Sequence, residues 1–258
     1  MTELTNPVVD TFCWVELATS DPSAAKSFYS AAFGWELADM DMPMGKYTMA
    51  TIGGKSVCGM MLLPEEAKQM GAPPHWLSYV ATSDVAASLA KVAELGGTKL
   101  AGPMDIGPGS MAVVADPSGG VFAFWQPKQS MGAWLYREPN ALCWNELLTT
   151  NVDAAGKFYS TLFGWKPEAM PMPEGTYTVF KKGEEGVAGM MAMPPMAAGA
   201  PSAWFPYFAV QSTDGFIEKV TKLGAKVQVP PQDVPNVGRF AVLVDPQGAT
   251  FAVLQPAM

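Results

Sequence analysis

The chain has 258 residues, of which 49% are apolar, and a formal net charge of −8 at pH 7. Its acidic residues are scattered, and it lacks the basic patches that nucleic acids and anionic membranes require, so neither partner is expected. Residues 1–10 have no signal-peptide pattern, and no apolar stretch reaches the roughly 20 residues that span a bilayer. Three cysteines without metal-site spacing suit a reducing compartment, so we expect a cytoplasmic protein with structural thiols.

The first predicted elements are a strand over residues 8–19 and a helix directly after it. Asp21 and Pro22 are typical of a helix start, and Gly34 is typical of a helix end. Between these positions the apolar residues recur at helical spacing and form one stripe. These residues are Ala25, Phe28, Tyr29 and Ala32.

Three short strands are predicted next, near residues 35–39, 47–52 and 57–63, before a loop rich in Pro, Ala and Met. The order then restarts with a strand near residues 76–82 and a helix that Asp84 caps. Three more strands follow, and the turn at Asp116-Pro117 joins the last two. The first half therefore contains two βαβββ units.

The second half repeats the first. Cys13-Trp14 returns as Cys143-Trp144, 130 positions later, and Phe33-Gly34-Trp35 returns at 163–165. We therefore expect an α+β fold of four βαβββ units, in which each half forms an eight-stranded open cup wide enough for a small ligand. The predicted domains are residues 1–128 and 139–258, joined by a linker at 129–138, and they should pack as an intramolecular pseudo-dimer in a monomer or homodimer.

With these motifs the chain resembles the vicinal oxygen chelate superfamily, which contains glyoxalase I, bleomycin-resistance proteins and extradiol dioxygenases. The motifs are the strand-to-cap run 14–21, the segment 28–35, the helix 84–97 and the Asp-Pro turn, each in two copies. The layout is similar to the mycobacterial culture-filtrate antigen and antibiotic-pathway hydroxylase type. The resemblance covers nearly the whole chain and implies tandem glyoxalase-like domains.

The resemblance also implies a divalent metal held by His, Gln or Glu side chains inside the cup. In this sequence those positions are Trp14, Leu77 and Ala123 in the first half. In the second half they are Trp144, Phe205 and Ala252. Carbon side chains cannot supply the three or four donors that a metal site needs, so no cofactor and no metal site are expected. The single histidine, His75, lies two positions from the implied ligand position and is expected to be a loop residue.

Glu16 and Glu146 are the candidate catalytic residues. Strand alternation places each on the same face as Trp14 or Trp144, which the resemblance identifies as the inner face. A carboxylate in an apolar hollow should have a raised pKa, which suits proton transfer, but it could also orient a ligand or only accept structural hydrogen bonds.

Trp14, Trp144 and several further residues are predicted to contact a ligand. Trp76 and Trp204 could line the cups or lie in the core, whereas Tyr79 and Tyr207 should face inward. Arg239 could meet an anionic ligand, pair with Glu146 or form a surface ion pair. The repeated methionines Met61 and Met191 add adaptable apolar surface or fill the core. Tyr47 and Tyr177 also recur as a pair.

Two functions remain open. The first is a protein that binds a small organic molecule in aromatic, Met-rich cups without the family metal. The alternative is an enzyme of lyase, isomerase or oxygenase type, in which Glu16 or Glu146 acts as base or holds a divalent metal such as Mg²⁺ or Mn²⁺. A purely structural role has no positive sign in the sequence.

Overall fold

We describe the fold from a computed structural model, which covers residues 8–42, 45–130, 132–172 and 175–257. The first half contains eight strands and three helices. The strands are β1 (Phe12–Thr19), β2 (Glu36–Met42), β3 (Gly45–Ile52), β4 (Lys55–Leu62), β5 (His75–Ala81), β6 (Thr98–Asp105), β7 (Gly109–Ala115) and β8 (Val121–Pro127). The helices are α1 (Pro22–Phe33), α2 (Glu65–Gln69) and α3 (Val85–Glu94).

The second half repeats this order, with a short 3-10 helix in place of α2. Its strands are β9 (Leu142–Thr149), β10 (Lys166–Met172), β11 (Gly175–Lys182), β12 (Glu185–Ala192), β13 (Ala203–Ala209), β14 (Lys226–Val234), β15 (Gly238–Val244) and β16 (Thr250–Pro256). Its helices are α4 (Val152–Phe163), η1 (Pro195–Ala197) and α5 (Thr213–Lys222). The Pro-, Ala- and Met-rich segment of the first half, expected to be a loop, thus contains α2.

The helices begin and end where the sequence predicted. The Asp21 side chain accepts a hydrogen bond from the Ala24 N–H at the start of α1, and Asn151 does the same for Ala154 in α4. Both helices end at a glycine in the left-handed conformation, Gly34 and Gly164.

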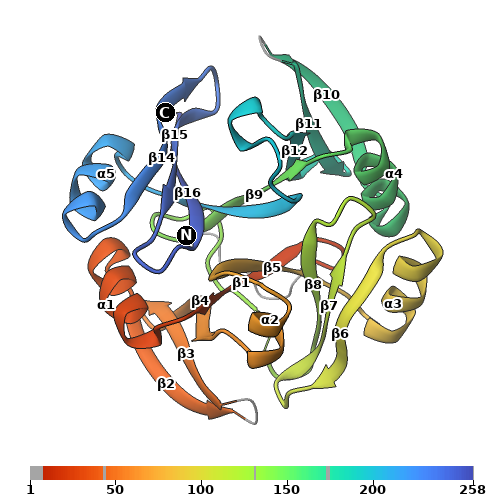
Figure 1. Cartoon of the computed structure of the whole chain (residues 1–258), viewed down its shortest axis with the longest axis horizontal. Coiled ribbons are helices and arrows are strands. Elements are labelled where there is room, and N and C mark those ends of the chain that lie inside the picture. Colours follow the sequence, from red (N-terminus) through yellow and green to blue (C-terminus); the bar gives the residue numbers. More distant parts are fainter. Residues whose placement is uncertain (1–7, 43–44, 131, 173–174, 258) are drawn as a thin grey trace.

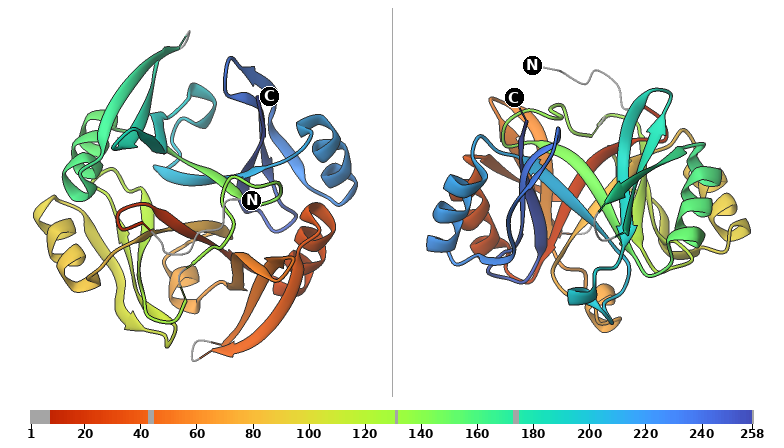
Figure 2. Two further views of the ribbon diagram at one scale, coloured as in Figure 1. Left: turned by 180° about the vertical axis from the view of Figure 1, so that it is seen from behind. Right: turned by 90° about the horizontal axis from the view of Figure 1, so that it is seen from above.

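Each half forms one eight-stranded mixed sheet that curls into a half-barrel (Figures 1 and 2). The strand orders are β2-β3-β4-β1-β5-β8-β7-β6 and β10-β11-β12-β9-β13-β16-β15-β14. The helices lie outside the half-barrels, with α1 beside α5 and α3 beside α4 (Figure 1). The α+β class and the tandem repeat are confirmed, and the concave face of each sheet is left without a helix.

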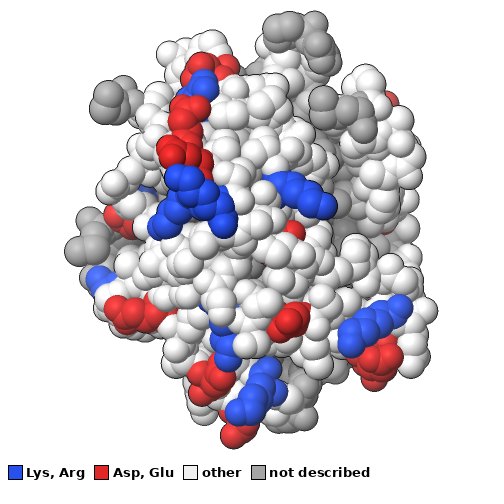
Figure 3. Space-filling view, turned by 60° about the vertical axis from the view of Figure 1, so that its left-hand side comes forward, with Lys and Arg blue, Asp and Glu red and all other residues white. Residues whose placement is uncertain are grey.

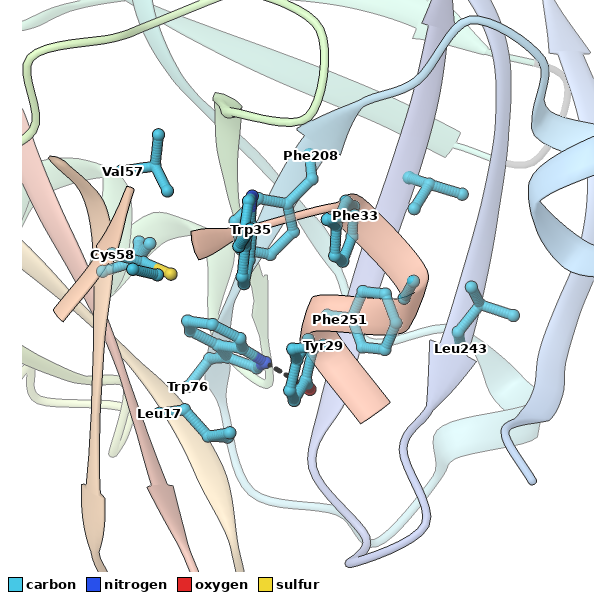
Figure 4. Packing of buried hydrophobic residues seen from close by; sticks show 14 of the residues in the cluster. Leu17, Tyr29, Phe33, Trp35, Val57, Cys58, Trp76, Phe208, Leu243 and Phe251 are labelled. Atoms are coloured by element: carbon cyan, nitrogen blue, oxygen red, sulfur yellow. Dashed lines mark hydrogen bonds between the residues drawn. The ribbon is translucent and has the colours of Figure 1, made fainter. Parts of the chain in front are cut away.

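The two largest cores are shared between the halves. Helix α1 packs its stripe against Phe208 and Phe251 of the second sheet and against Phe216 of α5 (Figure 4). Helix α4 packs in the same way against Phe122 and Phe124 of the first sheet. Each half therefore completes its convex-side core with a helix from the other half, as expected for a pseudo-dimer.

A buried tyrosine–carboxyl hydrogen bond crosses each shared core. The Tyr29 hydroxyl donates to Asp245 at 2.9 Å, and the Tyr159 hydroxyl donates to Asp116 at 2.8 Å. The carboxyls belong to the Asp-Pro turns, where their other oxygen accepts backbone N–H groups. Burial raises the pKa of the Tyr29 hydroxyl, and the neighbouring Asp245 raises it further.

The linker and the first strand differ from the sequence-based expectation. Strand β1 begins at Phe12, and a bulge after Phe12 turns Cys13 to the same cluster as Trp14, whereas simple alternation predicts opposite faces. The linker aromatics Trp134 and Tyr136 are expected from the sequence to dock on a domain surface, and Tyr136 does pack against a shared core beside the buried Leu135, whereas Trp134 is exposed. The three cysteines are buried free thiols, as predicted. Among the described residues, none of the helices is long and apolar enough to cross a bilayer.

The tyrosine–carboxyl bonds should couple the halves energetically. We expect Tyr29→Phe to destabilise the chain by about 1–3 kcal/mol, because it leaves a buried carboxyl oxygen without its donor. A double-mutant cycle with Asp245→Asn, followed by urea denaturation, should give a coupling energy of about 1 kcal/mol. Simple additivity of the two single substitutions would contradict this role.

Candidate functional site

The concave face of the first sheet carries a hydrogen-bonded cluster around one carboxyl, which we call the Glu16 cluster: Trp14, Glu16, Tyr47 and Tyr79. The Tyr79 hydroxyl donates to Glu16 Oε1 at 2.9 Å. The Tyr47 hydroxyl also hydrogen-bonds the Glu16 carboxyl. The Trp14 Nε1–H donates to the Tyr47 hydroxyl at 3.1 Å. Two phenols therefore converge on one carboxyl, and an indole orients one of the phenols.

The second sheet carries the same arrangement, the Glu146 cluster: Trp144, Glu146, Tyr177 and Tyr207. The Tyr207 hydroxyl donates to Glu146 Oε1 at 2.9 Å, and Trp144 Nε1–H donates to the Tyr177 hydroxyl at 2.9 Å. Tyr177 also hydrogen-bonds the Glu146 carboxyl. Glu16 and Glu146 are each half-buried as whole residues.

A glycine opposite each glutamate makes the cluster possible. Gly59 pairs with Glu16 on the neighbouring strand β4, and the Tyr47 side chain crosses above it from β3. A methyl group at Gly59 would lie 1.8 Å from the Tyr47 hydroxyl oxygen, and one at Gly189 would lie 1.9 Å from that of Tyr177. The first residue of the repeated Gly-Met-Met motif therefore supplies the space through which each tyrosine reaches its carboxyl.

Burial among apolar side chains raises the pKa of the Glu16 carboxyl, although the hydrogen bonds from Tyr47 and Tyr79 act in the opposite direction. The same causes raise the pKa of the Glu146 carboxyl. The pKa values of the partner tyrosines lie well above their usual range because of burial and the nearby carboxyl. Each cluster can therefore hold a proton on its carboxyl or accept a hydrogen bond from a ligand.

The positions implied as metal ligands lie close together, but they are occupied by apolar side chains. Trp14, Leu77 and Ala123 share one buried cluster on the first concave face. The neighbouring Glu16 carboxyl has two tyrosines as partners. Among the described residues, no three or more His, Cys, Asp or Glu side chains lie close enough to hold a metal ion. The donor set therefore does not fit the family's divalent metal.

Six of the predicted ligand-contacting residues lie at or beside these clusters on the concave faces, and Trp14 and Trp144 are two of them. Tyr79 and Tyr207 belong to the clusters, as the alternation of the strands predicted. Met61 pairs with Tyr47 across β3 and β4, and Met191 pairs with Tyr177 across β11 and β12.

Trp76 and Trp204 lie elsewhere. They are buried in the two shared cores on the convex side, where each indole N–H donates to the helix tyrosine of its own half (Figure 4). They lie on the opposite side of the sheet because Trp76 is three residues before Tyr79 on one strand. Of the two alternatives from the sequence, the structure places both tryptophans in the core.

Arg239 also lies away from the Glu146 cluster. Its guanidinium contacts Asp214 and Asp233 at 2.8 Å each, which is a surface ion pair. Figure 3 brings the side with α1 and α5 forward and shows basic and acidic groups in small mixed groups on a mainly uncharged surface. His75 is the first residue of β5, and its Nδ1–H donates a hydrogen bond to the Pro73 carbonyl in the preceding loop at 2.8 Å.

Tyr47 and Tyr177 were missing from the predicted site. Their repetition at equivalent positions was visible in the sequence, but the distance of 31 residues between Glu16 and Tyr47 gave no sign of contact. The signal that could have found them is the glycine that begins each repeated Gly-Met-Met triplet (59–61 and 189–191), because a glycine within a strand often marks a close approach by a neighbouring group.

The sequence matches the family model described as Glyoxalase/Bleomycin resistance protein/Dioxygenase superfamily over residues 11–124 and again over 142–253. The chain is 43% identical over 248 residues to "Putative glyoxylase CFP32" from Mycobacterium tuberculosis, covering 95% of this chain and 94% of that protein. It is 34% identical over 254 residues to "Anthracycline biosynthesis protein DnrV" from Streptomyces peucetius, covering 94% and 92%.

Solved structures share the fold at low sequence identity. The Mn(II)-bound glyoxalase from Novosphingobium aromaticivorans superposes with a TM-score of 0.66 at 16% identity, covering 96% of this chain and 84% of that one. The 2,3-dioxygenase LapB from Pseudomonas sp. KL28 gives a TM-score of 0.67 at 12% identity, covering 98% and 94%.

The glycine gap should be required for the cluster. We expect Gly59→Ala and Gly189→Ala each to cost about 1–3 kcal/mol of stability, because the new methyl group displaces a tyrosine hydroxyl. Gly156→Ala in α4 is the matched control, since its methyl group would be 3.5 Å from Met190 and a helical alanine stabilises by up to about 1 kcal/mol. Equal effects at all three glycines in urea denaturation would contradict the proposed packing.

The buried carboxyls should also give a pH signature. Because the folded pKa values of Glu16 and Glu146 are raised, the folded chain keeps these protons at pH values where the unfolded chain, with a Glu pKa of about 4.3, has lost them. Their contribution to stability is therefore greatest below about pH 4.3 and is lost as the pH rises through the folded pKa values.

The measurement is the unfolding free energy of the wild type and of the Glu16→Gln, Glu146→Gln double variant from pH 4 to pH 8. The variant lacks both titrating groups, so its stability relative to the wild type should increase with pH across this window. A difference that stays constant with pH would show that the two carboxyls are not shifted.

Proposed function

The chain belongs to the glyoxalase/bleomycin resistance protein/dioxygenase superfamily, and on that premise we propose that it binds a small organic molecule on the concave face of its sheets without the family's metal ion. The observation that carries the proposal is the carboxyl held by two tyrosines, repeated in both halves. This carboxyl lies where the resemblance implies a metal-chelating site. The implied ligand positions around it are occupied by apolar side chains.

The chemistry of the cluster favours a flat aromatic ligand with a hydrogen-bond donor. Aromatic and methionine side chains offer a polarisable apolar wall, and the glutamate is the group that can accept a hydrogen bond from a phenol or an amine. Two Streptomyces relatives, 34% and 33% identical, are named anthracycline biosynthesis proteins. An anthracycline, as a flat polycyclic phenol, belongs to this chemical class of ligand. A ligand of this class suits both the wall and the carboxyl.

The alternative is an enzyme in which Glu16 or Glu146 transfers a proton. The specific observation in its favour is that burial raises the pKa of each carboxyl toward the range in which a general acid or base works at neutral pH. In that case the ligand would be chemically changed after binding. A use of either glutamate as a metal ligand would need further donors from water and substrate, because the neighbouring tyrosines already engage the carboxyl.

The first test is binding by the full-length chain after treatment with a chelator. We expect the anthracycline daunorubicin to quench the tryptophan fluorescence saturably, with the same dissociation constant with or without EDTA and with no new product in the recovered ligand. Failure to bind daunorubicin and a panel of aromatic amines and phenols would overturn the proposal. Loss of binding in EDTA would overturn its metal-free form, and turnover would favour the enzyme.

The second test uses matched tryptophan substitutions. The Trp14→Phe, Trp144→Phe double variant removes the indole donors of both clusters and should weaken binding roughly tenfold, which corresponds to about 1.4 kcal/mol. Trp134→Phe is the control, because this linker indole is 45% exposed and outside both clusters. Equal effects of the two changes would place the ligand elsewhere.

A further inference from the structure

The two concave faces differ in how far they are open. Four residues of the first face are nearly inaccessible, with exposed fractions of 6–8%, whereas the equivalent residues of the second face are half-buried. The equivalent pairs are Trp14 and Trp144, Leu77 and Phe205, Met111 and Phe240, and Trp125 and Leu254. The difference has the same direction in all four pairs, so these side chains are more deeply buried on the first face than on the second.

A segment of the linker closes the first face. Ser130 and residues 132–134, which we call the strap, lie along one rim of the first half-barrel, at the end of the molecule opposite α2 and η1 (Figure 2, right). The Ala133 N–H donates to the Cys13 carbonyl at 2.8 Å, and Ala133 packs into the same cluster as Trp14 and Met111. The strap is therefore part of the wall that buries these side chains.

Two side chains of the first sheet anchor the strap. The Trp125 indole N–H donates to the Ser130 carbonyl at 3.0 Å, and the Ser56 hydroxyl donates to the Gly132 carbonyl at 3.0 Å. The Ser56 carbonyl also accepts the Trp134 N–H at 2.9 Å. These contacts hold both ends of the strap against the rim.

The second sheet lacks both side-chain anchors. Leu254 stands where the first half has Trp125, and Gly186 stands where it has Ser56. Neither side chain can donate a hydrogen bond to a backbone carbonyl. At the Gly186 position the linker makes a different contact, in which the exposed Arg137 guanidinium donates to the Gly186 carbonyl at 2.9 Å. With Leu254 and Gly186 at these two positions, the second sheet lacks the two hydrogen bonds that hold the strap on the first sheet.

We propose that the second concave face, around Glu146, is the ligand site, and that the strap turns the first face into a closed structural core. This inference rests on the proposed function for the ligand and adds which half binds it. The open wall of Trp144, Phe205 and Phe240 receives the flat aromatic part of the ligand. Its phenol or amine group reaches the Glu146 carboxyl.

The strap can be tested without any ligand. Met111→Cys and Phe240→Cys place a thiol at equivalent positions of the two faces, and the three native thiols are buried. We expect N-ethylmaleimide, followed by mass spectrometry, to label the second variant at least roughly tenfold faster than the first. Leu77→Cys and Phe205→Cys form a second pair that should show the same ratio, and equal rates in both pairs would overturn the closed first face.

A single substitution should open the strap. Gly132 has φ +102°, and a methyl group there would lie 2.5 Å from the Cys13 carbonyl oxygen. Gly132→Ala should therefore lift the strap and speed the labelling of Met111→Cys roughly tenfold, while the rate at Phe240→Cys stays the same. No change at Met111→Cys would show that the strap does not close this face.

The ligand part of the inference is tested by stoichiometry. Calorimetric titration with daunorubicin should give one site per wild-type chain, and Glu146→Gln should weaken that site at least roughly tenfold through the lost carboxylate interaction. Two sites per wild-type chain, or an unchanged dissociation constant in Glu146→Gln, would overturn the assignment. No binding at all would overturn both ligand proposals, while the labelling rates would still decide whether the strap closes the first face.

Discussion

The exchange of helices between the halves is the constraint on which the rest of the structure depends. Each half buries the convex side of its sheet only by accepting a helix from the other half, and each exchange places a tyrosine hydroxyl on a buried aspartate of the other half. A buried carboxyl without a donor is costly, so the apolar contacts and the hydrogen bond specify the same docking geometry. Because both convex sides are used in this way, the concave sides are the surfaces left for other purposes.

On the concave sides, each half-buried glutamate depends on the glycine that pairs with it on the neighbouring strand. A glutamate on the central strand β1 or β9 faces mainly apolar neighbours, and it is tolerated because two tyrosines donate to it. One of those tyrosines reaches it only over a glycine. The glycine is therefore required for the polar cluster although it has no side chain. The same arrangement, a tyrosine crossing over a glycine, occurs in both halves.

Duplication allows the two concave faces to diverge while the fold is kept. Either face can be filled without disturbing the shared cores, because the clusters around Glu16 and Glu146 lie on the other side of the sheets from the exchanged helices. The first face has Trp125, whose indole N–H helps to hold a segment of the linker against the rim, and Met111 lies in the same cluster. The second has Leu254 and Phe240 in their place and remains half-buried.

The sequence by itself determined the repeat, the α+β class and the ends of the helices, because caps, stop glycines and apolar spacing are local properties of the chain. Alternation along the first strand placed Glu16 on the same face as Trp14, and the family resemblance identified that face, and the face of Tyr79, as the inner one. The tertiary structure decided the side-chain contacts that alternation along a strand does not predict. It placed Trp76 against Tyr29 on the convex side, and it brought Tyr47 over Gly59 to Glu16, because both contacts depend on the register and curl of strands distant in sequence. It alone decided that the linker covers one face and not the other, since a backbone segment finds its anchors, Ser56 and Trp125, only after the sheet has closed around them.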